Sequence, residues 1–308
     1  MQGILIINKP KGYTSFDCVA IARRQSGERR CGHTGTLDPD ATGVLPICIG
    51  KATRLIEYMD GAPKQYRCVC RLGVETSTYD LSGEITGGVR LSGGEGCVWP
   101  SEEELNAALQ AFTGEIEQYP PLYSAVKVNG KRLYKYALEG KSVEIKTRRV
   151  TVYSIVLLDY DRAEGQFTMD VTCSRGTYVR SICHDLGKAL GTGAAMAELV
   201  RLSTGGFDIS EAIDVEELKT MSPEELEQRL YPAERAVQAL ESIETDERGR
   251  DLFMNGNLEF SRHVKPRMRA EFREDDDIAV FCGGVFLGTA KVKADVAGLK
   301  LVPGKVFK

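Results

Sequence analysis

The sequence has no hydrophobic run long enough to cross a bilayer, and the apolar run at its N-terminus ends after four residues, before Asn8. We therefore expect a soluble protein that is neither secreted nor embedded in a membrane. The chain has nine cysteines, but they lack the paired spacing of zinc sites and the density of a disulfide scaffold. We interpret them as small buried side chains of a protein in a reducing compartment, the cytoplasm.

Metal and cofactor motifs are also missing. The three histidines fall at none of the spacings expected of metal ligands, and neither a Rossmann glycine fingerprint nor a P-loop occurs. A metal site built from His33, Asp38 and Asp40 is an alternative, but no HxxxH or HExxH spacing supports it. We therefore expect neither a metal ion nor a cofactor.

The chain lacks a positive net charge, at −4 with 40 basic and 44 acidic residues, which by itself argues against a polyanionic partner. The charges are segregated, however. Residues 211–247 hold twelve acidic and three basic side chains, whereas residues 127–149 hold two acidic and eight basic ones. One basic surface can contact phosphates while the acidic segment faces away, although an ordinary solvated charge pattern would look the same. The eight basic residues are Lys127, Lys131, Arg132, Lys135, Lys141, Lys146, Arg148 and Arg149.

The elements that are present predict an α+β fold without tandem repeats. Residues 101–104 and 222–225 have the spacing of helix capping boxes, and Thr14 or Ser15 can cap a helix that Gly27 ends. Runs rich in β-branched and aromatic residues predict strands at 66–72 and 150–158, and apolar residues that alternate with polar ones predict a strand at 167–173. Together these elements predict a large, mixed, mostly antiparallel sheet flanked by helices.

A change in composition near residue 249 predicts two domains, 1–248 and 249–308. In the second, two apolar runs flank Gly283 and Gly284, which is a hairpin signal, so we expect a small all-β domain. Residues 87–96 contain five glycines and are expected to form a surface loop. The C-terminal domain carries a second basic cluster, made of Arg262, Lys265, Arg267, Arg269 and Arg273.

Residues 32–46, GHTGTLDPDATGVLP, form the most informative segment. Three glycines and two prolines surround two carboxylates, one histidine and three threonines, and a loop this constrained holds its side chains in fixed positions. From the residues alone, Asp38 could simply make an Asx turn ahead of Pro39, and Asp40 could cap the segment that follows.

The segment GHTGTLDPDATGVLPICIGKATRL closely resembles the signature loop of the bacterial TruB family of tRNA pseudouridine synthases. Further segments are similar to other motifs of this family and occur in the same order. The end of the chain, with FLGTAKV and LVPGKVF, is similar to the family's small PUA-type RNA-binding domain. The resemblance implies the pseudouridine synthase fold. The further segments are LIINKPKGYTS (5–15), KQYRCVCRLGVETSTYDLSGEI (64–85), YPPLYSAVKVNGKRLYKYA (119–137) and CSRGTYVRSICHDLG (173–187).

The resemblance also implies roles for particular positions. Asp38 corresponds to the family's essential aspartate, Tyr66 to the tyrosine that stacks on the target base, and Arg180 to the arginine that pairs with the aspartate. Three more positions are implied to contact the RNA: Tyr178 and Leu199, which line the family's pocket, and His33, which helps to occupy the space left by the extruded base.

The implied activity is the isomerisation of uridine to pseudouridine at position 55, in the T loop of tRNA. A base stacked in an RNA loop must be flipped out before it reacts, and a flat side chain such as Tyr66 then replaces the lost stacking. Without the resemblance, an aromatic on a strand such as Tyr66 is more often part of the core. The reaction breaks the C1′–N1 bond and makes a C1′–C5 bond without oxidation or an imported group, so it requires no cofactor. Arg180 is expected to keep Asp38 ionised, because an opposite charge lowers the pKa of an acid.

Several alternatives stay open. Asp38 could attack the sugar, attack the base or remove a proton. The protein could also be a guide-RNA-dependent pseudouridine synthase, which needs accessory proteins, or a tRNA-binding or tRNA-folding chaperone. The N-terminus beginning directly at LIINKP and the bacterial form of the signature loop favour a stand-alone enzyme without an obligatory protein partner. We expect its partner to be tRNA, bound in part by Lys127, Lys131 and Arg132.

Overall fold

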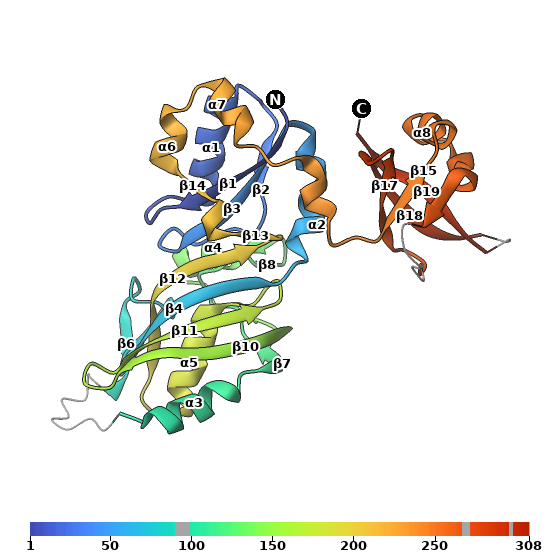
Figure 1. Cartoon of the computed structure of the whole chain (residues 1–308). Coiled ribbons are helices and arrows are strands. Elements are labelled where there is room, and N and C mark those ends of the chain that lie inside the picture. Colours follow the sequence, from blue (N-terminus) through green and yellow to red (C-terminus); the bar gives the residue numbers. More distant parts are fainter. Residues whose placement is uncertain (90–98, 267–271, 296–297, 308) are drawn as a thin grey trace.

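The computed structural model describes residues 1–89, 99–266, 272–295 and 298–307. Its main body is built on a ten-stranded sheet in which most neighbouring strands are antiparallel (Figure 1). The fold class predicted from the sequence is therefore confirmed. In spatial order the strands are β14 (Ile213–Asp214), β1 (Gly3–Lys9), β3 (Thr42–Ile49), β12 (Ala194–Thr204), β4 (Lys64–Leu72), β11 (Gln166–Cys173), β10 (Arg148–Asp161) and β7 (Gly114–Gln118), with β13 (Phe207–Asp208) on β12 and β2 (Cys31–His33) on β3.

Helices cover the sheet, and capping residues begin several of them. Thr14 and Asp17 form a capping box at α1, and the boxes expected at 101–104 and 222–225 begin α3 and α7. The helices are α1 (Ser15–Ser26), α2 (Ile56–Asp60), α3 (Glu102–Gln110), α4 (Leu133–Leu138), α5 (Val179–Ala189), α6 (Val215–Thr220), α7 (Pro223–Gln228) and α8 (Glu247–Met254), with short 3-10 turns η1 (Gly50–Leu55), η3 (Ile209–Glu211), η4 (Ala233–Val237) and η5 (Leu258–His263).

Alternation along β4 divides the sheet into a core face and an outer face. Tyr66, Cys68 and Cys70 are buried, whereas Arg67 between them is exposed. The neighbouring strand β11 shows the same alternation and pairs antiparallel with β4, so their buried side chains form one core with those of α3 and α5. Tyr66 therefore lies on the side of the sheet that α5 covers.

Strand β12 joins the two halves of the sheet. It runs antiparallel to β4 and parallel to β3, which it meets at Val200 and Arg201. The approach is so close that a Cβ on Gly43 would lie 2.2 Å from the Arg201 carbonyl oxygen, and Gly43 has a φ of 102°. Only glycine fits this junction. The loop between β2 and β3 ends here, at the start of β3.

A second, five-stranded sheet forms the β domain expected at the C-terminus, and the hairpin predicted at Gly283 and Gly284 is confirmed. The helix α8 and η5 pack beside this sheet. Sheet pairing already begins at Ser242, inside the range 1–248 assigned to the first domain. The strands are β16 (Val264–Pro266), β15 (Ser242–Thr245), β17 (Asp277–Cys282), β18 (Val285–Asp295) and β19 (Gly298–Val306); two small pairs, β5 (Glu75–Thr76) with β6 (Ile85–Gly87) and β8 (Lys127–Val128) with β9 (Lys131–Arg132), stand apart.

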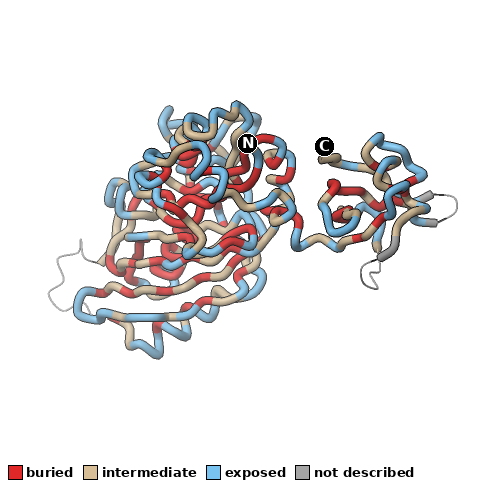
Figure 2. The backbone as a smooth tube through the Cα atoms, turned by 45° about the horizontal axis from the view of Figure 1, so that its top comes forward, coloured by how far each residue is buried: buried red, intermediate tan, exposed pale blue. Residues whose placement is uncertain are grey.

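The C-terminal unit has its own core, and buried residues form two separate groups in Figure 2. It contacts the body near α2, where Lys305 pairs with Glu57 at 2.6 Å and the Tyr58 hydroxyl lies 3.2 Å from that of Thr289. No helix in the described ranges is long and apolar enough to cross a membrane. Most of the glycine-rich segment 87–96, together with Arg267 and Arg269, lies outside the described residues.

Candidate active site

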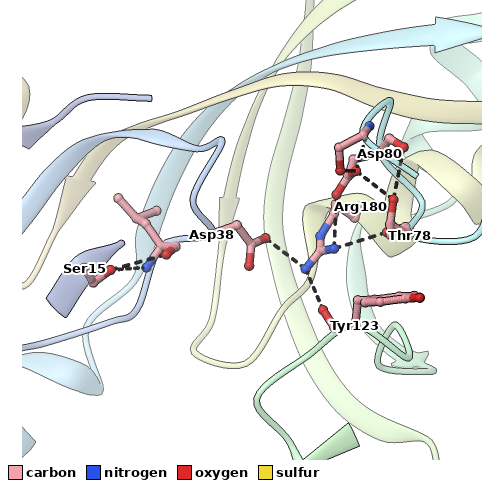
Figure 3. A network of polar contacts seen from close by, with 8 residues as sticks. Ser15, Asp38, Thr78, Asp80, Tyr123 and Arg180 are labelled. Carbon is pink, nitrogen blue, oxygen red and sulfur yellow. Dashed lines mark hydrogen bonds and ion pairs between the residues drawn. The ribbon is translucent and has the colours of Figure 1, made fainter. Parts of the chain in front are cut away.

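Asp38 lies in the loop between β2 and β3, and backbone bonds hold this loop on both sides. The Ala41 amide donates to the Asp38 carbonyl at 3.1 Å, which closes a turn, and the Gly12 amide donates to the Pro39 carbonyl at 2.9 Å. Buried Lys9 reinforces the same place, because its Nζ donates to the Pro39 carbonyl at 3.0 Å. This is a turn closed by backbone atoms, not the Asx turn that the residues alone suggested, because the Asp38 carboxylate points toward α5 and pairs with Arg180 (Figure 3).

Arg180, in the first turn of α5, contacts Asp38 directly. Its Nη2 lies 2.9 Å from Asp38 Oδ2 and donates to the Tyr123 carbonyl at 3.2 Å. Its Nη1 donates to Asp80 Oδ2 and to the Thr78 carbonyl, both at 3.1 Å (Figure 3). The Arg180 side chain keeps 6% of its surface exposed and that of Asp38 keeps 45%. The cation is thus fixed by several groups, while the Asp38 carboxylate stays open to the site.

The site raises the pKa of Asp38 above its ordinary value. Burial is the main cause, and the negative charge of Asp80 acts in the same direction, whereas Arg180 opposes both. The sequence led us to expect that Arg180 keeps Asp38 ionised. Arg180 does favour the ionised form of Asp38, and it limits the rise that burial causes in the pKa.

Asp38 borders two cavities. A small one of about 90 Å³ brings together the predicted residues Asp38, Tyr66, Tyr178, Arg180 and Leu199. A larger one of about 490 Å³ shares Asp38, Arg180 and Leu199 with it and is also lined by Asp80. Burial raises the pKa of Tyr66, so its ring carries a neutral phenol beside the carboxylate. The small cavity offers a planar side chain within reach of an acidic group.

His33 lies in a neighbouring cavity of about 360 Å³ that shares Tyr66 and Tyr178 with the small one. Burial lowers the pKa of His33, which favours its neutral form. The exposed ring of Phe16 meets the His33 ring edge-on, with centroids 5.2 Å apart. The two cavities therefore adjoin at Tyr66 and Tyr178.

The three basic residues predicted to bind RNA lie elsewhere. Lys127, Lys131 and Arg132 form the β8–β9 hairpin, and none of them lines the cavities described above. Lys131 pairs with Glu139 and lies over the Tyr136 ring. The hairpin is connected to the site through the chain, because it follows Tyr123, whose carbonyl accepts from Arg180.

Reasoning from the sequence missed Asp80, the second carboxylate on Arg180. It falls in the segment YDLSG, in a turn without periodic pattern, and 100 residues separate it from Arg180. Its own carboxylate is held by the hydroxyl groups of Thr78 at 2.7 Å and Ser82 at 2.5 Å. The clustering of small hydroxyl residues around one acid was the available signal.

Family comparisons match most of this body. Residues 23–179 match the model described as TruB family pseudouridylate synthase, N-terminal domain, and residues 180–238 match the tRNA pseudouridylate synthase B C-terminal domain. The chain belongs to the TruB family. Asp38 lies in the first matched range and Arg180 begins the second, so the ion pair joins the two matched domains. Both ranges end before β15 begins.

Curated relatives and solved structures agree with this assignment. The chain is 40% identical over 306 residues to tRNA pseudouridine synthase B of Clostridium perfringens, covering 98% of each protein. It is 43% identical over 263 residues to the protein of the same name from Geobacillus thermodenitrificans, covering 84% of this chain and 85% of the relative. A chain in a crystal structure of a Cbf5–Nop10–Gar1 complex superposes with a TM-score of 0.75 at 26% identity, covering 99% of this chain and 85% of that one.

The described part of this TruB chain contains no cluster of three or more His, Cys, Asp or Glu side chains arranged to hold a metal ion. His33 and Asp38, considered as metal ligands from the sequence, line different cavities.

Proposed function

We propose that the protein isomerises uridine 55 in the T loop of tRNA to pseudouridine, with Asp38 as the catalytic carboxylate and no metal ion or cofactor. The observation that carries this proposal is the contact of Asp38 with Arg180 at the mouth of the cavity that Tyr66 lines, in a TruB chain. The relatives named tRNA pseudouridine synthase B support the choice of tRNA as the substrate. We also propose that the enzyme is located in the cytoplasm.

Each group in the site has a chemical task. The flipped uracil stacks on Tyr66, next to Tyr178 and Leu199, and this replaces the stacking that it loses in the RNA. Asp38 then acts on the sugar or the base as a nucleophile, or removes a proton, while the C1′–N1 bond breaks and the C1′–C5 bond forms. Arg180 keeps a positive charge beside the carboxylate and favours its reactive, ionised form.

Affinity for tRNA comes from basic surfaces outside the site. Lys127 and Arg132 are exposed on the β8–β9 hairpin, and Arg262 is exposed on the C-terminal unit. Phosphate contacts from such residues position the RNA without performing chemistry. We assign the catalytic work to the body that ends before Ser242, and an RNA-binding task to the unit from Ser242 to the C-terminus.

The test uses purified protein, an unmodified tRNA transcript and no added protein or guide RNA. Pseudouridine should form at position 55, and Asp38→Asn should abolish it while lowering tRNA affinity far less. Asp40→Asn is the matched control and should leave most of the activity intact, because Asp40 is exposed in the same loop and does not line the small cavity that contains Tyr66. If Asp40→Asn abolishes turnover and Asp38→Asn does not, the assignment is wrong.

Two other functions predict different outcomes. The likeness to a Cbf5 chain draws attention to the first alternative, a guide-RNA-dependent synthase. Such an enzyme would be inactive on tRNA alone. A chaperone that only binds and folds tRNA would keep its effect on tRNA in the Asp38→Asn variant and yield no pseudouridine in either form.

A further inference from the structure

Tyr79 has an uncommon backbone conformation and an unusually close ring contact. Its φ is 65°, in the left-handed region that glycine, asparagine and aspartate adopt most readily. Its ring stacks on the ring of His184, with centroids 3.8 Å apart and an angle of 11° between the planes. A tyrosine in a strained backbone position persists when its surroundings hold it there, and such positions cluster at functional sites.

The residues on either side of Tyr79 are those that hold Arg180. Arg180 Nη1 donates to the Thr78 carbonyl and to the Asp80 carboxylate. We call residues 78–80 the arginine-binding turn. Among the described residues, the Tyr79 side chain has no hydrogen bond or ion pair with Asp38 or Arg180. Any effect of its ring on the reaction therefore acts through the arginine-binding turn.

The helix that carries Arg180 also carries His184. The two residues are four positions apart in α5, which places them on the same face of the helix. This face therefore contacts the arginine-binding turn twice, once through the guanidinium of Arg180 and once, a helical turn further on, through the ring of His184. Backbone bonds attach the same turn to β12, since Met196 donates to the Tyr79 carbonyl at 3.0 Å and accepts from the Leu81 amide at 2.9 Å.

We propose that Tyr79 and His184 are positioning residues, whose ring stack fixes the arginine-binding turn against α5 and so holds Arg180 where it pairs with Asp38. This inference rests on the proposed function of the site. The backbone hydrogen bonds to β12 fix the position of the turn along the sheet, whereas the ring stack fixes its distance from α5. Both are needed because Arg180 reaches from the helix to the turn.

The stack works between uncharged rings. Burial and the charge of Lys188 lower the pKa of His184, whereas Asp185 and Glu75 oppose them. Burial together with Asp185 and Glu75 raises the pKa of Tyr79. At neutral pH a neutral imidazole thus faces a neutral phenol, and a phenyl ring should replace either of them.

The experiment measures kcat and KM for pseudouridine formation in an unmodified tRNA transcript. Tyr79→Asn removes the ring but tolerates a positive φ, and His184→Leu removes the planar ring from the helix. Each should lower kcat by about tenfold and leave KM for tRNA within about twofold of the wild-type value, because the protein surface that binds the RNA is unchanged. Tyr79→Phe and His184→Phe should both stay within about twofold of the wild-type kcat.

The double variant separates positioning from two independent losses. If one stack is responsible, Tyr79→Asn combined with His184→Leu should lower kcat no further than either change alone. Tyr153→Asn is the matched control, since Tyr153 is exposed on β10 and lines none of the cavities of the site. It should not alter kcat.

Unchanged kcat in folded Tyr79→Asn or His184→Leu protein would overturn the proposal. The proposal would also be overturned if the losses of kcat multiply in the double variant. The same holds if Tyr79→Phe or His184→Phe lowers kcat as much as the variant without the ring. If His184→Leu does not fold, His184→Gln, which keeps a polar side chain beside Lys188, takes its place in the same comparison. Absence of pseudouridine with the wild-type protein would instead refute the proposed function, and this inference with it.

Discussion

The hydroxyl of Ser15 exchanges two hydrogen bonds with the backbone of Leu37: the Leu37 amide donates to it at 3.0 Å, and it donates to the Leu37 carbonyl at 3.3 Å. Ser15 is the first residue of α1, and Leu37 directly precedes Asp38. Both residues are buried. The start of α1 thus holds the backbone from which the Asp38 carboxylate projects (Figure 3).

Removing this hydroxyl should weaken both the fold and the site. Ser15→Ala leaves the Leu37 amide and carbonyl unpaired in a buried place, so the free energy of unfolding should fall by about 1–3 kcal/mol. We expect kcat to fall as well, since Asp38 loses its support. Thr14→Ala is the control, because it removes the cap of the same helix at a cost of about 1 kcal/mol without touching Leu37. Denaturant unfolding and turnover on tRNA measure the two effects, and an unchanged kcat in Ser15→Ala would contradict the second.

The acid side of the pH profile should respond to Asp80. In the proposed mechanism Asp38 acts in its ionised form, and its pKa is raised, so kcat/KM should fall with decreasing pH already above the range of an ordinary aspartate. The charge of Asp80 contributes to this rise. Asp80→Asn should therefore move the acid limb to lower pH, even though kcat itself decreases because Arg180 loses a charged partner.

Profiles normalised to each variant's own maximum test this shift. Asp40→Asn should move the limb in the same direction but by less, because Asp40 raises the pKa of Asp38 more weakly than Asp80 does. A limb that moves to higher pH in Asp80→Asn would mean that another group titrates there.

Lys9 should be a major contributor to stability. It is fully buried, and its Nζ donates to the carbonyls of Pro10 at 3.0 Å, Tyr13 at 2.6 Å and Pro39 at 3.0 Å. Lys9→Met keeps a long side chain but leaves these carbonyls without their donor, so the free energy of unfolding should fall by about 3 kcal/mol. Lys11→Met, an exposed neighbour, should change it by less than about 0.5 kcal/mol. Equal effects of the two substitutions on the urea midpoint would disprove the structural role of Lys9.

The C-terminal unit should contribute affinity more than rate. A chain ending at Glu241 should fold and form pseudouridine, but it should bind tRNA more weakly. The slope of its binding constant against salt concentration should fall by the equivalent of about one to three phosphate contacts. A chain ending at residue 248 should be less soluble, because it leaves β15 without β16 and β17 and exposes an unpaired strand edge. Binding as tight as that of the full chain would assign the unit another task.

Local pattern was enough to predict the elements that carry the site. The alternation in β4 and β11, and the capping boxes before α3 and α7, depend on side chains within a few residues of one another. The hairpin at Gly283 and Gly284 has a similarly local cause. The start of the C-terminal unit was harder, because β15 is a four-residue strand whose partners β16 and β17 begin only at Val264 and Asp277.

The site itself depends on contacts between distant parts of the chain. The resemblance to a family supplied Asp38, Tyr66 and Arg180, whereas Asp80 and the Tyr79–His184 stack required coordinates. Turn residues such as Asp80 leave no periodic signal, and the partner of a ring or a carboxylate is set by packing rather than by spacing along the chain. The roles of the predicted residues in the reaction stay predictions until the variants are measured.

The double pairing of Arg180 has a consequence for the course of the reaction. If Asp38 gives up its negative charge, to a proton or to a covalent bond, Arg180 still faces Asp80 at 3.1 Å. A buried cation without a partner is costly, and here none is created at that moment. The Arg180 guanidinium and the Asp80 carboxylate together carry no net charge. In the proposed reaction, Asp38 can therefore lose and regain its charge in every turnover without leaving the guanidinium unpaired.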